Sequence, residues 1–419
     1  MEGPSPSPFE RHFVWLCSLL VIAALVSSFA DVMTMLKGNY AAFQVAPGLR
    51  LLREGIYSIL LIDFAFVMAG AKNRPVMNRG ALLIAVASLV WIAIAAFYSN
   101  TLDLPPVVIL AGLRFLEYIP LSFISAVVYL NAGSRPFRKI AKVVFLFLLV
   151  ETLFGFVETR MALNIWGTTF LGRRAFGTLP SPNLFGAATL FCFLLIRAAL
   201  PPRWYWPAFA LATFDVFASG SRAAVLGLLI GIGANYYSRI TNAWARMALL
   251  IGSAVISPAM ILLVSAPEIT GRSTGLGEGG FERLGVWSRV LTNLNSVAHI
   301  IIGWGTGLGS NTVFSLYGGL LKGNYISDNT FFFLVGSFGI IGVLIFVSVF
   351  AVLAWILADD PPGLATIIAL LLMLLISQAL ETYPLNVLAM LLLGWRVAVV
   401  GDARRRATHG FIPAQPLST

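Results

Sequence analysis

The stretch from Asn329 to Leu357, NTFFFLVGSFGIIGVLIFVSVFAVLAWIL, contains no charged side chain. A helix needs roughly 20 mainly apolar residues to cross the hydrocarbon core of a bilayer, so this stretch is long enough to do so. Similar apolar stretches recur along the whole chain, which is 58% hydrophobic and only 11% charged. Soluble proteins carry about 25% charged residues, and disordered chains are poor in apolar ones. The sequence therefore predicts an all-α polytopic membrane protein.

About twelve stretches are long and apolar enough to be predicted as transmembrane helices. They cover residues 13–30, 56–71, 80–98, 107–131, 143–158, 184–200, 207–220, 222–237, 247–265, 329–357, 364–380 and 385–400. A long polar segment separates the ninth helix from the tenth. We therefore expect a cytoplasmic N-terminal tail (1–12), helices one to nine (13–265), a large periplasmic loop (266–328), helices ten to twelve (329–400) and a cytoplasmic C-terminal tail (401–419).

The basic residues predict how the chain is oriented. Lysines and arginines concentrate in one alternating set of connections, which includes residues 72–79, 135–142 and 197–203, and in the C-terminal tail. Short cytoplasmic loops carry such an excess of positive charge. We therefore place both termini in the cytoplasm of a bacterial inner membrane. The net charge of +10 is then explained by the lipid bilayer as partner, without nucleic acid.

A second group of arginines lies in the segments that this orientation places outside. A planar guanidinium offers paired donors that match a phosphate, which a lysine does not. Outward loops are normally poor in basic residues, so the group favours a diphosphate-linked lipid substrate over ordinary surface charge. Its members are Arg173, Arg174, Arg222, Arg272, Arg283 and Arg289.

Ionisable residues inside predicted spans are the other functional candidates. Arg114 and Glu117 are three residues apart, so they share a helix face and are expected to form an ion pair. Asp63, Glu151 and Asp215 either hold helices together or form the proton path of a transporter. The few cysteines and histidines have no metal-ligand spacing, so we expect neither a metal nor another cofactor.

Glycine patterns predict close helix packing rather than nucleotide binding. They are Gly227-x-x-x-Gly231 and Gly336-x-x-Gly339-x-x-Gly342. Gly305-Thr-Gly-Leu-Gly309 is similar to a dinucleotide fingerprint, but that motif needs a strand before it and a helix after it.

Several motifs occur in a characteristic order. They are Arg174-Ala-Phe-Gly-Thr-Leu-Pro-Ser-Pro-Asn183, Ser219-Gly-Ser-Arg222, Arg283-x-x-x-Trp287, Ile302-Gly-Trp-Gly-Thr-Gly-Leu-Gly-Ser310, Ser327-Asp-Asn329 and Gly339-Ile-Ile-Gly342. In this order, with a large outward loop before the tenth span, they resemble the O-antigen ligase and Wzy-type polysaccharide polymerase superfamily. The resemblance covers residues 170–345.

The resemblance implies a GT-C-like fold and a metal-independent glycosyltransferase. Its substrate would be an undecaprenyl-diphosphate-linked oligosaccharide, with a chain-length regulator and a flippase of the same pathway as partners. Asp328-Asn329 stands where the ligases typically carry His-Asn, which favours a polymerase of exopolysaccharide or O-antigen repeat units. An O-antigen ligase is the alternative within the superfamily. A lipid-linked glycan flippase or transporter is the alternative of another class.

The same resemblance suggests roles for individual residues. Asp328, Arg222 and Arg283 would be catalytic, the arginines holding the diphosphate and Asp328 orienting or deprotonating the acceptor hydroxyl. Alternatively, Asp328 only caps the helix that follows it. The residues expected to bind the diphosphate or the glycan are Arg173, Arg174, Arg289, Asn183 and Asn329.

Overall fold

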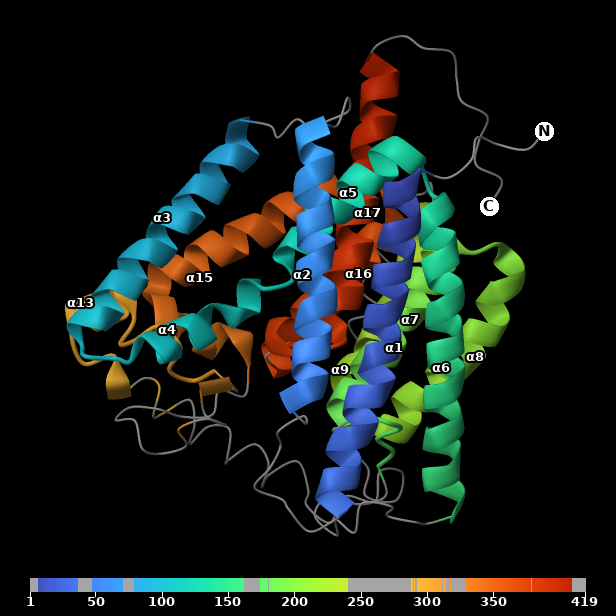
Figure 1. Ribbon diagram of the computed structural model, residues 1–419, viewed down its shortest axis with the longest axis horizontal. Coiled ribbons are helices and arrows are strands. Elements are labelled where there is room, and N and C mark those ends of the chain that lie inside the picture. Colours follow the sequence, from blue (N-terminus) through green and yellow to red (C-terminus); the bar gives the residue numbers. More distant parts are fainter. Residues whose placement is uncertain are drawn as a thin grey trace.

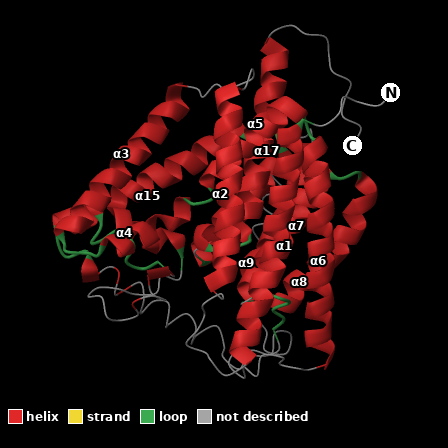
Figure 2. Cartoon of the chain, in the orientation of Figure 1, coloured by secondary structure: helices red, strands yellow, loops and turns green. Residues whose placement is uncertain are grey.

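The computed structural model describes residues 7–36, 47–70, 79–161, 174–179, 181–239, 292–310, 329–377 and 379–408, together with 288, 290, 312, 313 and 317. Within these ranges every regular element is a helix and none is a strand (Figure 2). The predicted span 247–265 and most of the predicted loop 266–328 lie outside the described residues.

Most described helices follow the predicted apolar stretches, whereas α13 lies within the predicted loop 266–328 (Figure 1). The first half contains α1 (Pro8–Leu36), α2 (Pro47–Gly70), α3 (Arg79–Thr101), α4 (Pro106–Gly112), η1 (Leu113–Leu116), α5 (Ile119–Ala132) and α6 (Arg135–Met161). The second half contains α7 (Pro182–Ala199), η3 (Pro202–Trp204), α8 (Tyr205–Ser219), α9 (Arg222–Arg239), α13 (Val297–Ile302), α15 (Thr330–Ile356), α16 (Pro361–Ile376), η5 (Ala379–Glu381) and α17 (Leu385–Thr408).

Seven of the described helical segments are long and apolar enough to cross a membrane. The longest are Pro106–Ala132 and Thr330–Ile356, at 27 residues each. Large apolar side chains such as Phe66, Leu83 and Trp355 are more than 70% exposed, which water would penalise and lipid would not. This is the architecture of an α-helical membrane protein.

Helix α7 is the centre of the main bundle, with 83% of its residues buried. Helices α6, α8, α9, α16 and α17 all contact it. Its start is fixed by Ser181, whose hydroxyl accepts the backbone N–H of Leu184 at 3.2 Å, and by Pro182 in the first turn. Gly227 and Gly231 of α9 face Leu190 and Leu194 of α7, which confirms the predicted close packing at this pair.

A smaller group of helices, α3, α4, α13 and α15, lies beside the main bundle (left in Figure 1). Residues 303–310, which follow α13, pack into a kink of α15 at Gly339, where φ is 64°. The Trp304 N–H donates to the Gly336 carbonyl at 2.9 Å, and the Trp91 indole donates to the Phe338 carbonyl at 2.9 Å. The glycine-rich stretch therefore follows a helix and fills a helix kink, which is not the setting of a dinucleotide site.

The predicted span 107–131 is not one continuous helix. It is interrupted by the 3₁₀ turn η1 between α4 and α5, which run in different directions (Figure 1). Pro120, in the first turn of α5, has no N–H to continue a helix from α4. A second interruption, η5, separates α16 from α17, and the two interruptions contact each other.

Several described helix ends lie at the same end of the molecule. The end of α2, the start of α3, the turn between α5 and α6 and the end of α17 all lie at one end of the molecule (top in Figure 1). The connections between α7 and α8 and between α8 and α9 lie at opposite ends of α8. The segment 174–179 and the α8–α9 turn lie at the other end (Figure 1).

Candidate functional site

Arg174 joins two of the motifs that are separate in the sequence. Its Nε donates to the carbonyl of Ser219 at 2.6 Å, and its Nη2 donates to Oδ1 of Asn183 at 2.8 Å. The next residue, Ala175, donates its backbone N–H to the carbonyl of Ala218 at 2.9 Å. Segment 174–179 therefore lies against the turn between α8 and α9, in which Arg222 begins α9.

Two carboxylates of α6 hold this segment by its main chain. Glu158, 8% exposed, accepts the N–H groups of Phe176 at 2.7 Å and Gly177 at 2.9 Å. Glu151, fully buried, accepts the N–H of Thr178 at 2.8 Å and also its hydroxyl. The glutamates are seven residues apart, so both project from the same face of α6. The position of Arg174 is thus set by α6 as well as by α8.

Besides these two carboxylates, whose oxygens are bound by main-chain N–H groups, the segment has positive groups beside it. Helices α7 and α9 both begin here, and the first turn of a helix presents backbone N–H groups with a partial positive charge. Arg174 and Arg222 add two guanidinium groups, each partly buried. We call this arrangement of Arg174, Asn183, Ser219 and Arg222 the arginine site.

Other residues that the sequence assigned to the site fall in different places. Arg173, Arg283, Arg289 and Asp328 lie outside the described residues, as does Arg272. Asn329 is described and is the N-cap of α15, its Oδ1 accepting the Phe332 N–H at 2.9 Å. The alternative that Asp328 only caps α15 is wrong, because Asn329 is the N-cap.

The ionisable residues inside the spans separate into three groups. Arg114 and Glu117 form the predicted ion pair, with Nε and Oε2 3.0 Å apart. Asp63 of α2 contacts His12 of α1, its Oδ2 lying 3.1 Å from Nδ1. Asp215 of α8 accepts a hydrogen bond from the hydroxyl of Thr152 at 2.8 Å, and Thr152 follows Glu151 in α6. Glu151 and Asp215 are therefore neighbours, whereas Asp63 belongs to a different pair of helices.

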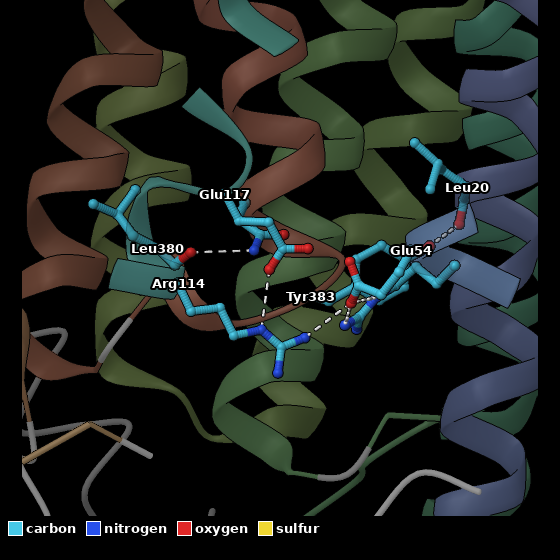
Figure 3. A network of polar contacts seen from close by, with 8 residues as sticks. Leu20, Glu54, Arg114, Glu117, Leu380 and Tyr383 are labelled. Atoms are coloured by element: carbon cyan, nitrogen blue, oxygen red, sulfur yellow. Dashed lines mark hydrogen bonds and ion pairs between the residues drawn. The ribbon is translucent and has the colours of Figure 1, made fainter. Parts of the chain in front are cut away.

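The Arg114–Glu117 pair is part of a larger network at the interruption η1 (Figure 3). Nη2 of Arg114 also donates to Oε1 of Glu54 in α2 at 3.1 Å, and the same carboxylate pairs with Arg53. The guanidinium of Arg53 lies 4.7 Å from the ring centre of Tyr383, in the connection between α16 and α17. Both helix interruptions therefore contribute to the network.

The sequence did not indicate a role for three residues, namely Glu158 near the arginine site and Arg53 and Glu54 in the network at η1. Glu158 sits at the edge of the predicted span 143–158, and only its spacing of seven from Glu151 could have drawn attention to it. Arg53 and Glu54 precede the predicted span 56–71, so they were not among the ionisable residues predicted inside spans. No local pattern indicates that Glu54 would meet Arg114.

No family model matches this chain, and no curated protein matches it. The functional assignment therefore rests on the residues themselves.

Proposed function

We propose that the protein is a membrane glycan transferase that acts on undecaprenyl-diphosphate-linked repeat units and joins them into exopolysaccharide or O-antigen. The observation that carries this proposal is that the Arg174 guanidinium, by its bonds to Asn183 and Ser219, joins the start of α7 to the turn from which Arg222 begins α9. A cationic site of this kind suits the diphosphate of a lipid-linked donor. The fold would be of the GT-C type.

In the proposed reaction an acceptor hydroxyl attacks the anomeric carbon of the donor sugar. The bond between that carbon and the diphosphate oxygen breaks, and the lipid diphosphate leaves with the bonding electrons. Arg174 and Arg222, with Arg283, would stabilise the negative charge that develops on the leaving group. Asp328 would accept the proton of the hydroxyl.

The direct test is deletion of the gene followed by sizing of lipid-linked and surface glycans. A surface glycan reduced to a single repeat unit would support the polymerase. Long polymer left on undecaprenyl diphosphate would instead identify the O-antigen ligase, the alternative within the same class. Unchanged glycans in both fractions would refute glycan transfer altogether.

The arginine site is tested by Arg222→Ala, because the Arg174 side chain also holds the α8–α9 turn and its loss would disturb the fold. Loss of one charge-assisted contact of about 1.5–3 kcal/mol lowers the rate roughly 10- to 150-fold. Arg222→Lys should recover only part of it, since an ammonium group lacks the paired donors. The matched control is Arg160→Ala, an exposed arginine whose guanidinium lies 5.5 Å from the Phe156 ring centre at the same end of the bundle.

A lipid-linked glycan flippase or transporter is the second candidate, and the network at η1 is what favours it. Discontinuous helices with ionisable residues near mid-depth are typical of transporter binding sites. A flippase would move a fluorescent lipid-linked saccharide across proteoliposomes without changing its length. Elongation without movement would select the transferase.

A further inference from the structure

The first turns of α6 carry basic side chains on one face. Residues three, four or seven positions apart lie on the same side of an α-helix. The basic residues with this spacing are Arg135, Arg138, Lys139 and Lys142. Lys139 is half-buried and the others are exposed. We call this set the α6 cation stripe. It lies at the end of the bundle that also holds the end of α17 (top in Figure 1).

The fold itself does not explain these cations. Like charges three or four residues apart on a helix repel each other, and the stripe is built of such pairs. Arg135 lies 3.8 Å from Glu10 of α1, but no described acid pairs with the other members of the stripe. The arginines at the end of α17 differ in this respect, since Arg406 lies 2.7 Å from Asp402. The α6 cation stripe is therefore an arrangement that a bound anion would stabilise.

Beyond the stripe, the same face of α6 is apolar and exposed. The helical spacing continues after Lys142 through Leu146, Leu149 and Leu153. These leucines are 59%, 45% and 61% exposed, whereas Phe147 on the opposite face is 1% exposed. One exposed face thus changes from cationic to apolar along the helix. A phospholipid has the same order, a charged headgroup followed by acyl chains.

The 3₁₀ turn η3 borders this face where its character changes. The Trp204 ring packs edge-to-face on Phe145 of α6, with centroids 4.8 Å apart. Phe145 lies about one turn after Lys142, so η3 is beside the junction of the cationic and apolar parts. Arg203 of η3 is exposed and has no acidic partner in the described part of the chain. Trp206, in the first turn of α8, is 68% exposed. Tryptophans are enriched at the depth of lipid headgroups.

We propose that α6 and η3 bind an anionic phospholipid. Its phosphate lies on the α6 cation stripe and Arg203, and an acyl chain lies along the exposed leucines. Guanidinium and ammonium groups both bind phosphate, and basic sites at the ends of transmembrane helices recognise anionic headgroups. A zwitterionic headgroup would add a cation to a group of cations, and a free phosphate would leave the leucines uncovered. The site lies at the opposite end of the bundle from the arginine site, so its failure would leave the proposed transfer reaction untouched (Figure 1).

The first measurement is native mass spectrometry of the full chain in a neutral detergent with added dioleoylphosphatidylglycerol. Lys142→Gln should weaken binding of the first lipid about fivefold, the effect of one basic residue near an anionic lipid surface. Arg138→Gln combined with Lys142→Gln should weaken it about 25-fold on the same basis. Arg160→Gln, at an exposed arginine near the other end of α6, is the matched control and should bind as the parent does.

Two results of this measurement would refute the site. Equal binding by the parent and the double variant would show that the stripe does not hold the lipid. An equal loss in Lys142→Gln and Arg160→Gln would show that only net charge matters.

The second measurement identifies the ligand by thermal unfolding in the same detergent, since a ligand that binds the folded protein raises its unfolding temperature. Phosphatidylglycerol should raise the unfolding temperature of the parent more than that of the double variant. Phosphatidylcholine should affect both equally, and glycerophosphoglycerol, the same headgroup without acyl chains, should affect neither. An effect of phosphatidylcholine as selective as that of phosphatidylglycerol would overturn the anionic headgroup. An equal effect of glycerophosphoglycerol would assign the stripe to a free phosphate and overturn the lipid.

The same assay without lipid separates binding from folding. The double variant should then unfold at or above the temperature of the parent, because two mutually repelling charges have been removed. A lower unfolding temperature without lipid would show that Arg138 and Lys142 hold the fold, and the proposal would be wrong.

Discussion

Replacing Gly339 by alanine tests how residues 301–310 are held against α15. Gly339 has φ 64° and ψ −169°, inside an otherwise helical segment. That region of backbone conformation is essentially restricted to glycine and costs other residues about 1–3 kcal/mol. A Cβ at this position would also meet the carbonyl group of Ile301 and, at 2.6 Å, the backbone nitrogen of Ile302.

The obstructing atoms are backbone, so they cannot move aside as a side-chain tip would. Overpacking of this kind costs typically about 1–3 kcal/mol. Together the two effects should destabilise the protein by roughly 2–6 kcal/mol, within the range of the largest single-residue effects. The matched control is Gly233→Ala in α9, where a Cβ meets nothing within 4 Å. There alanine should stabilise the helix by about 0.5–1 kcal/mol.

The assay is thermal unfolding of both variants in the same detergent, and fluorescence-detected size-exclusion chromatography monitors the loss of folded protein. Gly339→Ala should lose the monodisperse peak at a clearly lower temperature than the parent, and Gly233→Ala at the same or a higher one. If Gly339→Ala were as stable as the parent, residue 339 would not have the positive φ described here, nor would it lie against the backbone of α13.

Three further substitutions test other parts of the structure. Glu158→Ala leaves two buried N–H groups without their charged acceptor, and each loss costs about 1.5–3 kcal/mol. The unfolding temperature of this variant should therefore fall. The control is Thr159→Ala at the exposed neighbouring residue, which should unfold near the temperature of the parent. Asp360→Asn keeps an N-cap for α16 but breaks the buried ion pair with Arg396, which should lower the stability by about 3–5 kcal/mol. In the same unfolding assay, Asp360→Asn combined with Arg396→Leu should recover part of that stability. The topology is tested in intact spheroplasts, where Thr159→Cys should react with an impermeant thiol reagent and Asn131→Cys should not. Both native cysteines are buried and should not react. The reverse labelling pattern would place the arginine site in the cytoplasm.

The sequence predicted where the helices are, because apolar length is a local property. It predicted their ends less well. Helix α6 begins at Arg135, eight residues before the predicted span 143–158, because its basic first turns are helical but not apolar. The break at η1 was missed for a similar reason. Hydropathy sums residue types over a window and does not register the change of backbone direction between Gly112 and Pro120.

The arginine site was predicted in part. The motif around Arg174 and the one ending at Arg222 were both recognised, but their contact depends on how α6, α7 and α8 pack. Neither glutamate that holds the segment belongs to either motif. The ion pair of Arg114 and Glu117 followed from helical spacing, whereas its extension to Glu54 joins residues 60 positions apart and has no local signature.

The main-chain grip of α6 on segment 174–179 has a consequence for how this protein can diverge. Glu158 and Glu151 recognise N–H groups that every amino acid except proline possesses, so these main-chain bonds survive a change of side chain at Phe176 or Thr178, although a change at Thr178 also removes its hydroxyl bond to Glu151. Gly177 cannot change in this way, because its φ of 60° and the closeness of Phe185 exclude a side chain. Among natural variants, selection should therefore preserve the two glutamates and this glycine.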